Sequence, residues 1–260
     1  MSKPRILIID IETAPILASV WGLFDQTIPL GQIKKDWHLL SYSAKWLDEK
    51  KIFYKDQRNA KNIEDDKELL KEVWKLLDEA DIVLTQNGVK FDNKKLNARF
   101  ILNGMQPPSS FKNIDTLKIA RKHFAFTSNK LEYMTSKLCK KYKKLKHKKF
   151  PGFELWKECI AGNIEAWKEM EKYNKYDVLS LEELYHILSP WDNTINFQLY
   201  TDSEAPVCNC GSTSFLKRGF VYSNSGKFQR LRCNKCGKET KTKENLMSPE
   251  KRKSLTPGSR

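Results

Sequence analysis

The sequence lacks any apolar run that approaches the ~20 residues needed to cross a bilayer. It also lacks the pattern of a secretory signal peptide, because the short apolar run that follows Met1–Arg5 soon meets Asp10. We therefore expect a soluble, intracellular protein of the cytoplasm, with no membrane partner.

Acidic residues are few relative to basic ones. Asp and Glu number 32 against 47 Lys and Arg, which gives a net charge of +15. More than half of that excess, +8, lies in residues 201–260. The charge favours a polyanionic partner, of which nucleic acid is the commonest. The alternative is a merely soluble basic surface.

Cysteines are also few, and four of the six lie within residues 208–236. In a reducing compartment such clustering favours a metal site over disulfides or free thiols, which are the alternative. Cys139 and Cys159 lie in predicted helices and are expected to be packed thiols.

Apolar patterns predict an α/β fold. Apolar β-rich runs predict strands, and apolar stripes at helical spacing predict helices. The predicted strands are 5–11, 38–47, 51–56 and 82–86, and the predicted helices are 65–79, 92–103, 115–124, 129–142 and 163–188. Asp65 or Asp66 can cap the first of these helices. We expect a main domain over 1–198, a cysteine module over 199–240 and a disordered basic tail over 241–260.

Acidic side chains occur at three points of this pattern. Asp10 and Glu12 end the first strand, and their i, i+2 spacing puts both on one face of the sheet. Asp92 follows the fourth predicted strand and opens a helix. Tyr173 and Asp177 lie one turn apart on the last long helix. Clustered carboxylates suit Mg²⁺ or Mn²⁺.

Each motif alone has a structural explanation. The first fits a strand end that turns polar at the surface, Asp92 fits a helix cap, and Asp177 fits a solvated residue beside a packed Tyr173. Asp115 is a further acidic candidate, but it can equally cap the helix at 115–124. We leave it out of the metal set.

The order of the motifs resembles the DnaQ-like, ribonuclease H-like superfamily of 3′–5′ exonucleases. The residues that carry the resemblance are Ile9–Thr13, Asn87–Asp92 and Tyr173–Asp177, and Ile114–Leu117 fits the same style. Lys172 stands where the His-bearing branch has its histidine, so the Tyr-bearing DEDD branch is the closer match. The chain is similar to phage and bacterial exonucleases, which would place it in the host cytoplasm if a phage encodes it.

The resemblance implies a five-stranded mixed sheet, with three antiparallel strands and two parallel ones, flanked by helices. It implies two Mg²⁺ or Mn²⁺ ions held by four carboxylates. Asp10 would bridge both ions, and Glu12 and Asp177 would hold the ion that activates water. Asp92 would act largely through water at the other ion, and Tyr173 would orient the attacking water. Two such ions suit phosphodiester hydrolysis.

Nucleic-acid contacts are expected near these motifs and in a lysine-rich stretch. Eight lysines lie within residues 137–149, which suits phosphate contact; a solvated loop is the alternative. The candidate contacts in the main domain are Thr13, Asn87, Phe91, Lys140, Lys141, Lys143 and Lys144. An aromatic such as Trp21, Phe24 or Trp37 could stack on a terminal base, but core packing explains each equally well.

The cysteine module resembles a zinc ribbon. Its four cysteines suit one structural Zn²⁺ ion. They are Cys208, Cys210, Cys233 and Cys236. The first pair is one residue shorter than the usual spacing. Arg218, Arg230 and Arg232 make the module a candidate nucleic-acid contact, and a protein partner is the alternative.

Together these features predict a 3′–5′ exonuclease acting on single-stranded 3′ ends, with DNA expected as the substrate. An RNA exonuclease or a structure-specific endonuclease of the same fold is one alternative. A catalytically idle nucleic-acid-binding module that works through its zinc ribbon is another.

Overall fold

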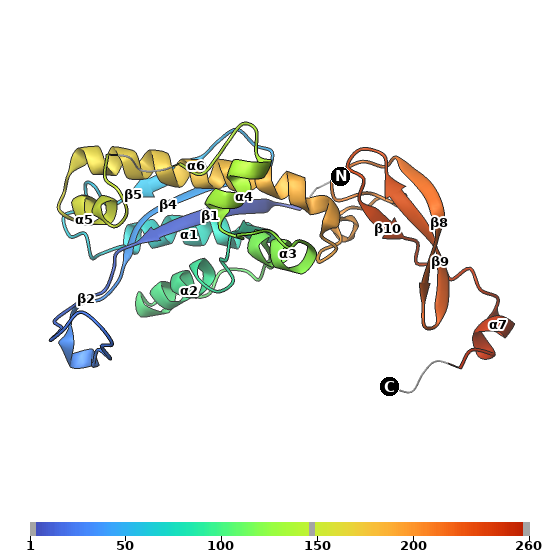
Figure 1. Cartoon of the computed structure of the whole chain (residues 1–260), viewed down its shortest axis with the longest axis horizontal. Coiled ribbons are helices and arrows are strands. Elements are labelled where there is room, and N and C mark those ends of the chain that lie inside the picture. Colours follow the sequence, from blue (N-terminus) through green and yellow to red (C-terminus); the bar gives the residue numbers. More distant parts are fainter. Residues whose placement is uncertain (1–3, 146–148, 257–260) are drawn as a thin grey trace. The chain divides into compact units, whose positions relative to one another are not determined.

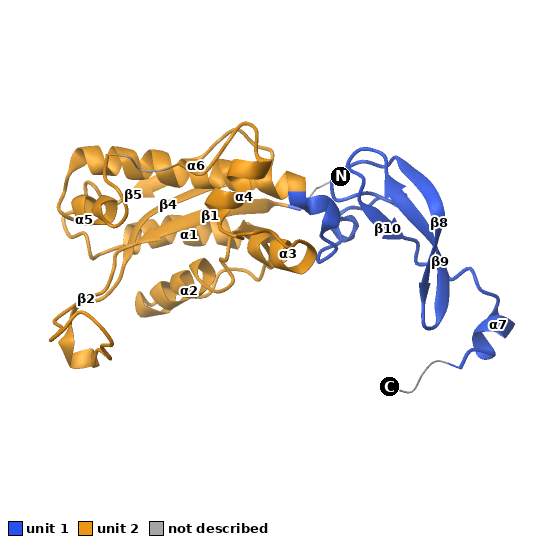
Figure 2. Cartoon of the chain, in the orientation of Figure 1, with its two compact units in different colours: residues 1–4, 188–260 blue, residues 5–187 orange. Residues whose placement is uncertain are grey.

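The computed structural model describes residues 4–145 and 149–256 (Figure 1). Two compact units divide the chain (Figure 2). The larger unit comprises Arg5–Ile187, and the smaller unit comprises residues 188–260 together with residues 1–4. Among the described residues, no helix is both long and apolar enough to span a membrane.

A five-stranded mixed sheet forms the centre of the larger unit. Its strands, in spatial order, are β5 (Phe53–Asp56), β4 (Leu39–Trp46), β1 (Ile6–Thr13), β6 (Ile82–Thr85) and β7 (Lys112–Asp115). The pairs β5–β4 and β4–β1 are antiparallel, whereas the pairs β1–β6 and β6–β7 are parallel. This is the sheet that the resemblance implies, so the predicted α/β fold is confirmed.

Helices cover both faces of this sheet (Figure 1). α1 (Lys67–Asp78) and α2 (Asp92–Leu102) pack on the face that carries Leu7, Ile9 and Ile11 of β1. α5 (Glu154–Ile160) and α6 (Ile164–Leu188) share a second apolar cluster with Leu40 and Ala14. α3 (Thr116–His123) and α4 (Leu131–Leu138) complete the helices of this unit. Since side chains alternate along a strand, Asp10 and Glu12 face away from α1 and α2.

Several elements differ from the sequence-based expectation. β7 ends at Asp115 and α3 begins at Thr116, where we expected one helix over 115–124. α4 covers only part of the helix expected over 129–142, and α5 contains Cys159, for which we expected a helix without giving its bounds. A two-stranded ribbon, β2 (Leu17–Ala18) and β3 (Ile33–Lys35), with the short helix η1 (Leu30–Gln32), leaves the sheet after β1.

Asp66 faces the interior instead of capping α1. Its fully buried carboxylate accepts hydrogen bonds from Nε and Nη2 of Arg99, at 2.8 and 2.7 Å, and from the backbone N–H of Leu39 at 2.8 Å. Asp65 accepts a bond from the Lys67 backbone N–H at 3.2 Å. Asp66 thereby ties α2 and β4 to the start of α1, because a buried carboxylate needs such partners.

The smaller unit holds a three-stranded antiparallel sheet of β8 (Phe215–Ser223), β9 (Gly226–Cys233) and β10 (Glu239–Lys241). The short helices η2 (Ser189–Trp191) and η3 (Phe197–Tyr200) precede it. Within residues 241–260, where we expected disorder, Lys241 belongs to β10 and Pro249–Lys253 form α7. Ser248 caps α7 by accepting from the Lys251 backbone N–H, and Pro249 suits its first turn.

Candidate functional site

Three carboxylates from β1 and α6 meet at one point. Asp10 and Glu12 face α6 from β1, and Asp177 faces them from the middle of α6. One carboxylate oxygen from each of the three lies within 4.8 Å of the others. The structure therefore brings together three of the four predicted metal ligands.

Asp92 approaches the same place from the start of α2. Its Oδ1 accepts the backbone N–H of Ile11, on β1 between Asp10 and Glu12, at 3.3 Å. This N–H lies beyond the β1–β6 pairing, which ends at Ile8. The side chain does not cap its own helix, because the N-cap of α2 is Phe91 and makes no side-chain cap bond. Among the described residues, Asp92 is outside the group of three that share the 4.8 Å limit.

Tyr173 lies one turn before Asp177 on α6, as predicted. It is buried, and its ring meets that of Trp156 edge to face, with centroids 6.1 Å apart. The indole N–H of Trp156 donates to Glu12 Oε2 at 3.2 Å. α5 thereby holds both Tyr173 and Glu12 through one side chain.

Asn174 fixes the first carboxylate. Its side-chain amide donates to Asp10 Oδ2 at 2.6 Å and to the Asp10 backbone oxygen at 3.3 Å. Its own oxygen accepts the hydroxyl of Ser41 at 3.2 Å. Asn174 and Ser41 are both fully buried, so this chain from β4 through α6 to β1 sets the orientation of Asp10.

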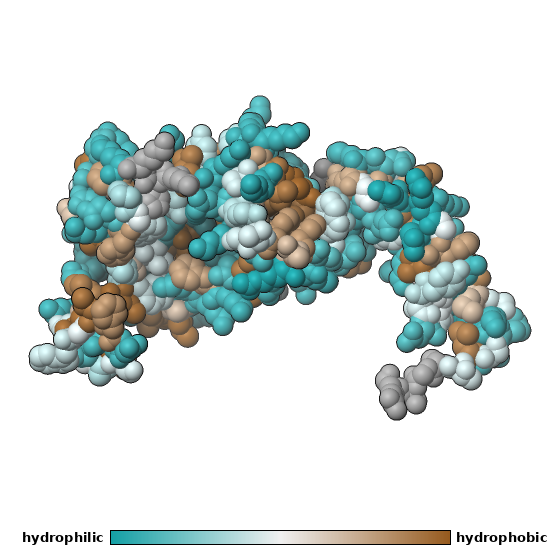
Figure 3. All heavy atoms as spheres, viewed as in Figure 1, coloured by the Kyte–Doolittle hydropathy of each residue, from teal (hydrophilic) through white to brown (hydrophobic). Residues whose placement is uncertain are grey.

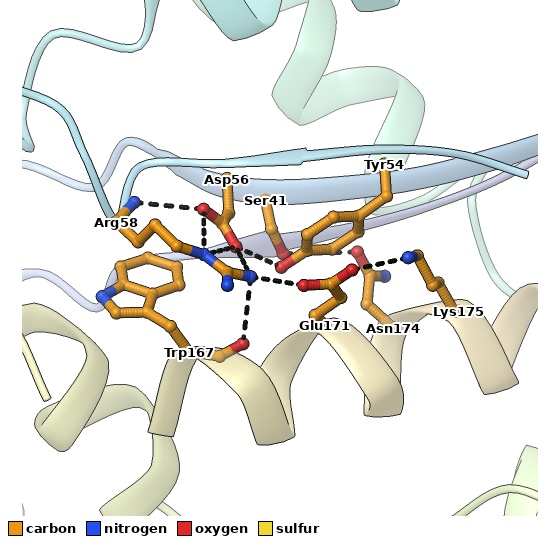
Figure 4. A network of polar contacts seen from close by, with 8 residues as sticks. All are labelled: Ser41, Tyr54, Asp56, Arg58, Trp167, Glu171, Asn174 and Lys175. Atoms are coloured by element: carbon orange, nitrogen blue, oxygen red, sulfur yellow. Dashed lines mark hydrogen bonds and ion pairs between the residues drawn. The ribbon is translucent and has the colours of Figure 1, made fainter. Parts of the chain in front are cut away.

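An ion-pair network holds α6 against β5 (Figure 4). Asp56 accepts the guanidinium of Arg58 and the hydroxyl of Tyr54, at 2.6 to 2.9 Å. Arg58 also donates a hydrogen bond to Glu171 of α6 at 2.6 Å, and Glu171 accepts another from the ammonium of Lys175 at 2.6 Å. Glu171 lies about one turn before Asn174 and Lys175 lies two residues before Asp177, so the network helps to fix the position of α6 along the sheet.

Lys144 enters the carboxylate cluster. Its ammonium pairs with Asp177 Oδ2 and lies 4.5 Å from the centre of the Tyr173 ring. Burial opposes its charge, but Asp177, Tyr173 and Asp10 raise the pKa of Lys144 above its ordinary value. Sequence reasoning assigned this lysine to phosphate contact, whereas the structure places its charge among the acidic side chains.

The carboxylates are crowded enough to perturb one another. Burial, together with Asp177, Glu12 and Asp92, raises the pKa of Asp10 well above its usual range, against the opposing effect of Lys144. Burial and Asp177 raise the pKa of Glu12 to about 8, and burial raises that of Asp92 to about 6. Such a cluster favours a cationic partner, because added positive charge stabilises the ionised forms.

The turn after β6 borders a cavity beside Lys144. Asn87 adopts a positive φ of 66°, and its backbone N–H donates to Asp115 at 2.8 Å. The next residue is Gly88. A Cβ atom at this position would lie 2.4 Å from Thr85 Oγ1, so only glycine fits. Asp115 also accepts the Leu117 backbone N–H and caps α3. The cavity, of about 480 Å³, is lined by Asn87, Arg121, Lys130 and Lys144 among others.

The other predicted nucleic-acid contacts of the larger unit are spread around this region. Thr13 lies at a bulge where β1 ends. Phe91 is 41% exposed, with the Lys95 ammonium 5.2 Å from its ring centre. The backbone N–H groups of Lys140 and Lys141 donate to Glu183. Lys143 is exposed. Lys146 and Lys148 lie outside the described residues.

Four cysteines gather in the smaller unit, as predicted. Cys208 Sγ lies 3.5 Å from Cys236 Sγ, and Cys210 Sγ lies 3.6 Å from Cys233 Sγ. All four sulfur atoms lie within 4.8 Å of one another. The shortened first pair therefore still presents both thiols, and the cluster is compatible with a zinc ribbon.

Two similar turns form the cysteine cluster. Gly211 and Gly237 have positive φ values of 80° and 77°, and each donates its N–H to the carbonyl oxygen of the cysteine that opens the turn, at 2.8 and 3.0 Å. Burial tends to raise the pKa of Cys233, but the backbone N–H groups of Cys236 and Lys235 lower it to about 6. Burial instead raises the pKa of Cys208 and Cys236, so Cys233 is the thiol of the cluster that ionises readily, as metal ligation requires.

The predicted arginine contacts of the smaller unit lie on its sheet. Arg218 belongs to β8, and Arg230 and Arg232 belong to β9. Arg218 and Arg232 are exposed, and Arg230 borders a cavity of about 760 Å³ beside the cysteine cluster.

Sequence reasoning missed three residues of the site. Asn174, Ser41 and Trp156 each contact a carboxylate or the residue that holds it. The position of Asn174 directly after Tyr173 on a largely apolar helix face was the one available signal. Nothing in the sequence marks Ser41 or Trp156.

Comparison with known proteins gives one family match. A model of the RNase_H superfamily matches residues 33–189, more than half of the chain. The matched range includes Asp92, Tyr173 and Asp177 and begins after β1. No curated protein sequence matches the chain.

Among solved structures, the family B DNA polymerase from the hyperthermophilic archaeon Pyrobaculum calidifontis is similar, at 12% sequence identity and a TM-score of 0.48. The match covers 73% of this chain and 26% of the polymerase chain, so this chain spans about a quarter of that polymerase.

The mixed sheet, the carboxylates on β1 and α6 and the family match all support a nuclease. On the strength of the family match, the chain belongs to the RNase_H superfamily.

Proposed function

We propose that this protein is a metal-dependent 3′–5′ exonuclease that hydrolyses phosphodiester bonds at single-stranded 3′ ends, with DNA as the preferred substrate. The observation that carries the proposal is the meeting of Asp10, Glu12 and Asp177 beside Tyr173. The sequence order of the motifs supplies the direction of cleavage, since they resemble those of 3′–5′ exonucleases.

The donor set fits divalent cations. Two Mg²⁺ or Mn²⁺ ions would be held by Asp10, Glu12 and Asp177, with Asp92 close by. Carboxylate oxygens are the ligands that these ions prefer. The raised pKa values of Asp10 and Glu12 and the ammonium of Lys144 among them support a site that calls for positive charge. Bound ions would lower the pKa of a water molecule and stabilise the charge on the leaving 3′ oxygen.

Tyr173 acts through its position. Burial and Asp177 raise the pKa of its phenol above the ordinary value, so it stays protonated and cannot serve as a base near neutral pH. Its ring is held between Trp156 and the ammonium of Lys144. A protonated phenol fixed in this way can orient the attacking water or a phosphate oxygen by hydrogen bonding.

The cavity beside the carboxylates suits the terminal nucleotide. Among the described residues of its wall, Arg121 and Lys130 bring positive charge against the single acidic residue Glu132, and Asn87 adds an amide. Lys144, which pairs with Asp177, links the cavity to the carboxylates. Basic side chains attract the phosphates of any single strand, with no base readout required. The proposed contact surface for the nucleic acid also includes Thr13, Phe91, Lys140, Lys141 and Lys143.

The smaller unit has a supporting role in this proposal. One structural Zn²⁺ would be held by the four cysteines Cys208, Cys210, Cys233 and Cys236. Their sulfur atoms lie within 4.8 Å of one another, which suits tetrahedral ligation. Arg218, Arg230 and Arg232 would contact the nucleic acid. A protein partner for this ribbon is the alternative.

A defined assay tests the function. An oligonucleotide labelled at its 5′ end, in DNA and RNA versions, is incubated with Mg²⁺ or Mn²⁺ and then with excess EDTA. We expect a ladder of products shortened one nucleotide at a time, formed on the DNA and stopped by EDTA. A 3′-phosphate block should stop the reaction, whereas a 5′ block should leave it unchanged.

Other products would select the alternatives. A ladder formed on RNA alone would select the RNA exonuclease, and internal cuts on the 3′-blocked strand would select the endonuclease. Tight binding without cleavage under any metal condition would select the idle binding module. Each of these outcomes contradicts the proposed DNA exonuclease.

A further inference from the structure

An apolar ribbon projects from the larger unit after β1. It comprises residues 15–36, with β2 and β3 as its two strands and η1 near its tip. The backbone N–H of Ala14 donates to His38 at 2.9 Å where the ribbon leaves the sheet, and Ser19 donates to Gln32 at 2.9 Å across it. These bonds give the ribbon a defined shape.

The side chains of this ribbon are large, apolar and exposed. Trp21 is 94% exposed, Leu23 88%, Leu30 85% and Phe24 82%. Four more large apolar side chains of the ribbon are also exposed, namely Ile16, Leu17, Val20 and Ile28. Hydrophobic residues gather over the ribbon at the lower left of the surface in Figure 3. A group of eight within fifteen residues is not the scattering of single apolar residues that is normal on a surface.

The size of this surface matches that of a protein interface. Together the eight side chains offer on the order of 1,000 Å², which exceeds the ~300–600 Å² of the largest apolar patch on a typical monomer. It also exceeds the ~800 Å² that each partner buries in a standard interface. Within the part of the chain that the structure describes, the two strands pair only with each other, so the outer edge of each is open to a further strand.

The charge of the ribbon identifies the partner. The exposed apolar stretch at residues 14–33 contains one charged residue, Asp25, and the rest of the ribbon adds Lys34, Lys35 and Asp36, so the ribbon has no net charge although the whole chain carries +15. Single-stranded nucleic acid needs basic side chains beside its stacking aromatics, whereas the two lysines of the ribbon, Lys34 and Lys35, follow the apolar stretch and Lys35 is paired with Glu64. Two copies of this chain repel each other elsewhere, but here they can approach without like-charge repulsion.

We propose that two copies of this chain associate through the apolar ribbon. A twofold arrangement places the same patch on both sides, so each ribbon covers the exposed side chains of the other. This inference does not rest on the proposed exonuclease activity, because Trp21, Leu23 and Phe24 are outside the carboxylate site.

Sedimentation velocity and light scattering on the full chain test the proposal over roughly 1–100 µM. We expect wild type to shift from monomer to dimer with concentration. The double variant Trp21→Ser/Phe24→Ser should weaken the dimer by about 100-fold or more, because central aromatic residues dominate such interfaces. Leu23→Lys should do the same by placing like charges face to face.

The matched control removes two apolar side chains elsewhere. Ile101 and Leu102 on α2 are 75% and 67% exposed, so Ile101→Ser/Leu102→Ser should leave the dimer unchanged. Circular dichroism should show that every variant keeps the fold, since the altered residues are exposed. A wild type that stays monomeric overturns the proposal, as does a ribbon variant that dimerises normally. Weaker oligonucleotide binding by the ribbon variant, with wild type monomeric, would assign the ribbon to nucleic acid instead.

Discussion

The carboxylate cluster and the cysteine cluster are assembled in opposite ways. The carboxylates come from β1, α2 and α6, which are far apart in the sequence and meet only through the sheet and its two layers of helices. The thiols come from two tight turns at the ends of one β-hairpin. One cluster depends on the whole larger unit, and the other on a few neighbouring residues.

The surroundings of the two clusters differ accordingly. The larger unit has two apolar clusters, one between the sheet and α1 and α2 and the other between the sheet and α5 and α6, so it can bring like charges together. Among the described residues of the smaller unit, the buried apolar side chains are few: Leu188, Phe197 and Leu231, with Cys208 and Cys233 of the cluster itself. A module of that size usually needs a metal to fold. The comparison teaches that metal loss should stop chemistry in one unit and folding in the other.

The largest expected effect comes from the first carboxylate. Asp10→Asn should lower the cleavage rate by about 1,000-fold or more, because metal ligation supplies several kcal/mol of transition-state stabilisation. Single-turnover kinetics on a labelled oligonucleotide measure it. Oligonucleotide affinity should change little, and the zinc content not at all. Asp48→Asn, at an exposed carboxylate, is the control. Wild-type turnover in Asp10→Asn would refute the metal assignment.

Loss of a thiol should act on structure instead. Cys233→Ser should lower zinc affinity by roughly 100-fold or more, and the smaller unit should become sensitive to protease, because metal binding and folding are linked. Mass spectrometry of the metal content and limited proteolysis measure this. Cys139→Ala, at a buried thiol outside the cluster, should retain zinc. Cleavage of a short oligonucleotide by Cys233→Ser should persist; its loss would mean that the two units do not act separately.

Asn174→Ala sharpens the comparison by disturbing the support of Asp10. Its amide is the side-chain partner that orients Asp10, and loss of such a partner typically costs about 10- to 100-fold in metal affinity or activity. A titration of activity against Mn²⁺ concentration should show a raised half-saturation point, which a purely structural defect would not produce. Tyr176→Phe, on the same helix, should leave the titration unchanged. An unaltered curve for Asn174→Ala would remove Asn174 from the site.

The smallest effect concerns the smaller unit's sheet. Arg218→Ala should weaken oligonucleotide binding less than tenfold and lower the salt slope of affinity by about one, as loss of a single phosphate contact does. Fluorescence anisotropy across a salt series measures both quantities. Lys50→Ala, at an exposed turn of the larger unit, should change neither. An unchanged slope in Arg218→Ala would favour a protein partner for the ribbon of β8 and β9.

Much of the fold could be predicted from local patterns. The strands at 5–11 and 82–86 are continuous apolar runs, so their identity as buried strands was clear from sequence. β7 was missed because Ile114 is its one apolar residue, and its pairing with β6 comes from the sheet. β2 and β3 were missed because their exposed apolar residues follow no strand or helix period.

The site shows the same division. Asp10, Glu12, Tyr173 and Asp177 were predicted because the spacing of each pair fits its own element and the order of the motifs resembles that of the exonuclease superfamily. The position of Lys144 among the acidic groups could not be predicted, since it depends on how the segment after α4 folds back onto α6. The inward turn of Asp66 toward Arg99 was hidden for the same reason.

The sequence by itself determined the donors: which carboxylates share a strand face, which lie one turn apart on a helix, and which thiols share a tight turn. These are short-range facts, set by the fixed periods of strands and helices. Tertiary structure alone decided that β1 faces α6, that Asn174 meets Asp10, and that the ammonium of Lys144 sits among the carboxylates. The reason is that long-range contacts follow from core packing and charge compensation, which depend on the whole unit at once.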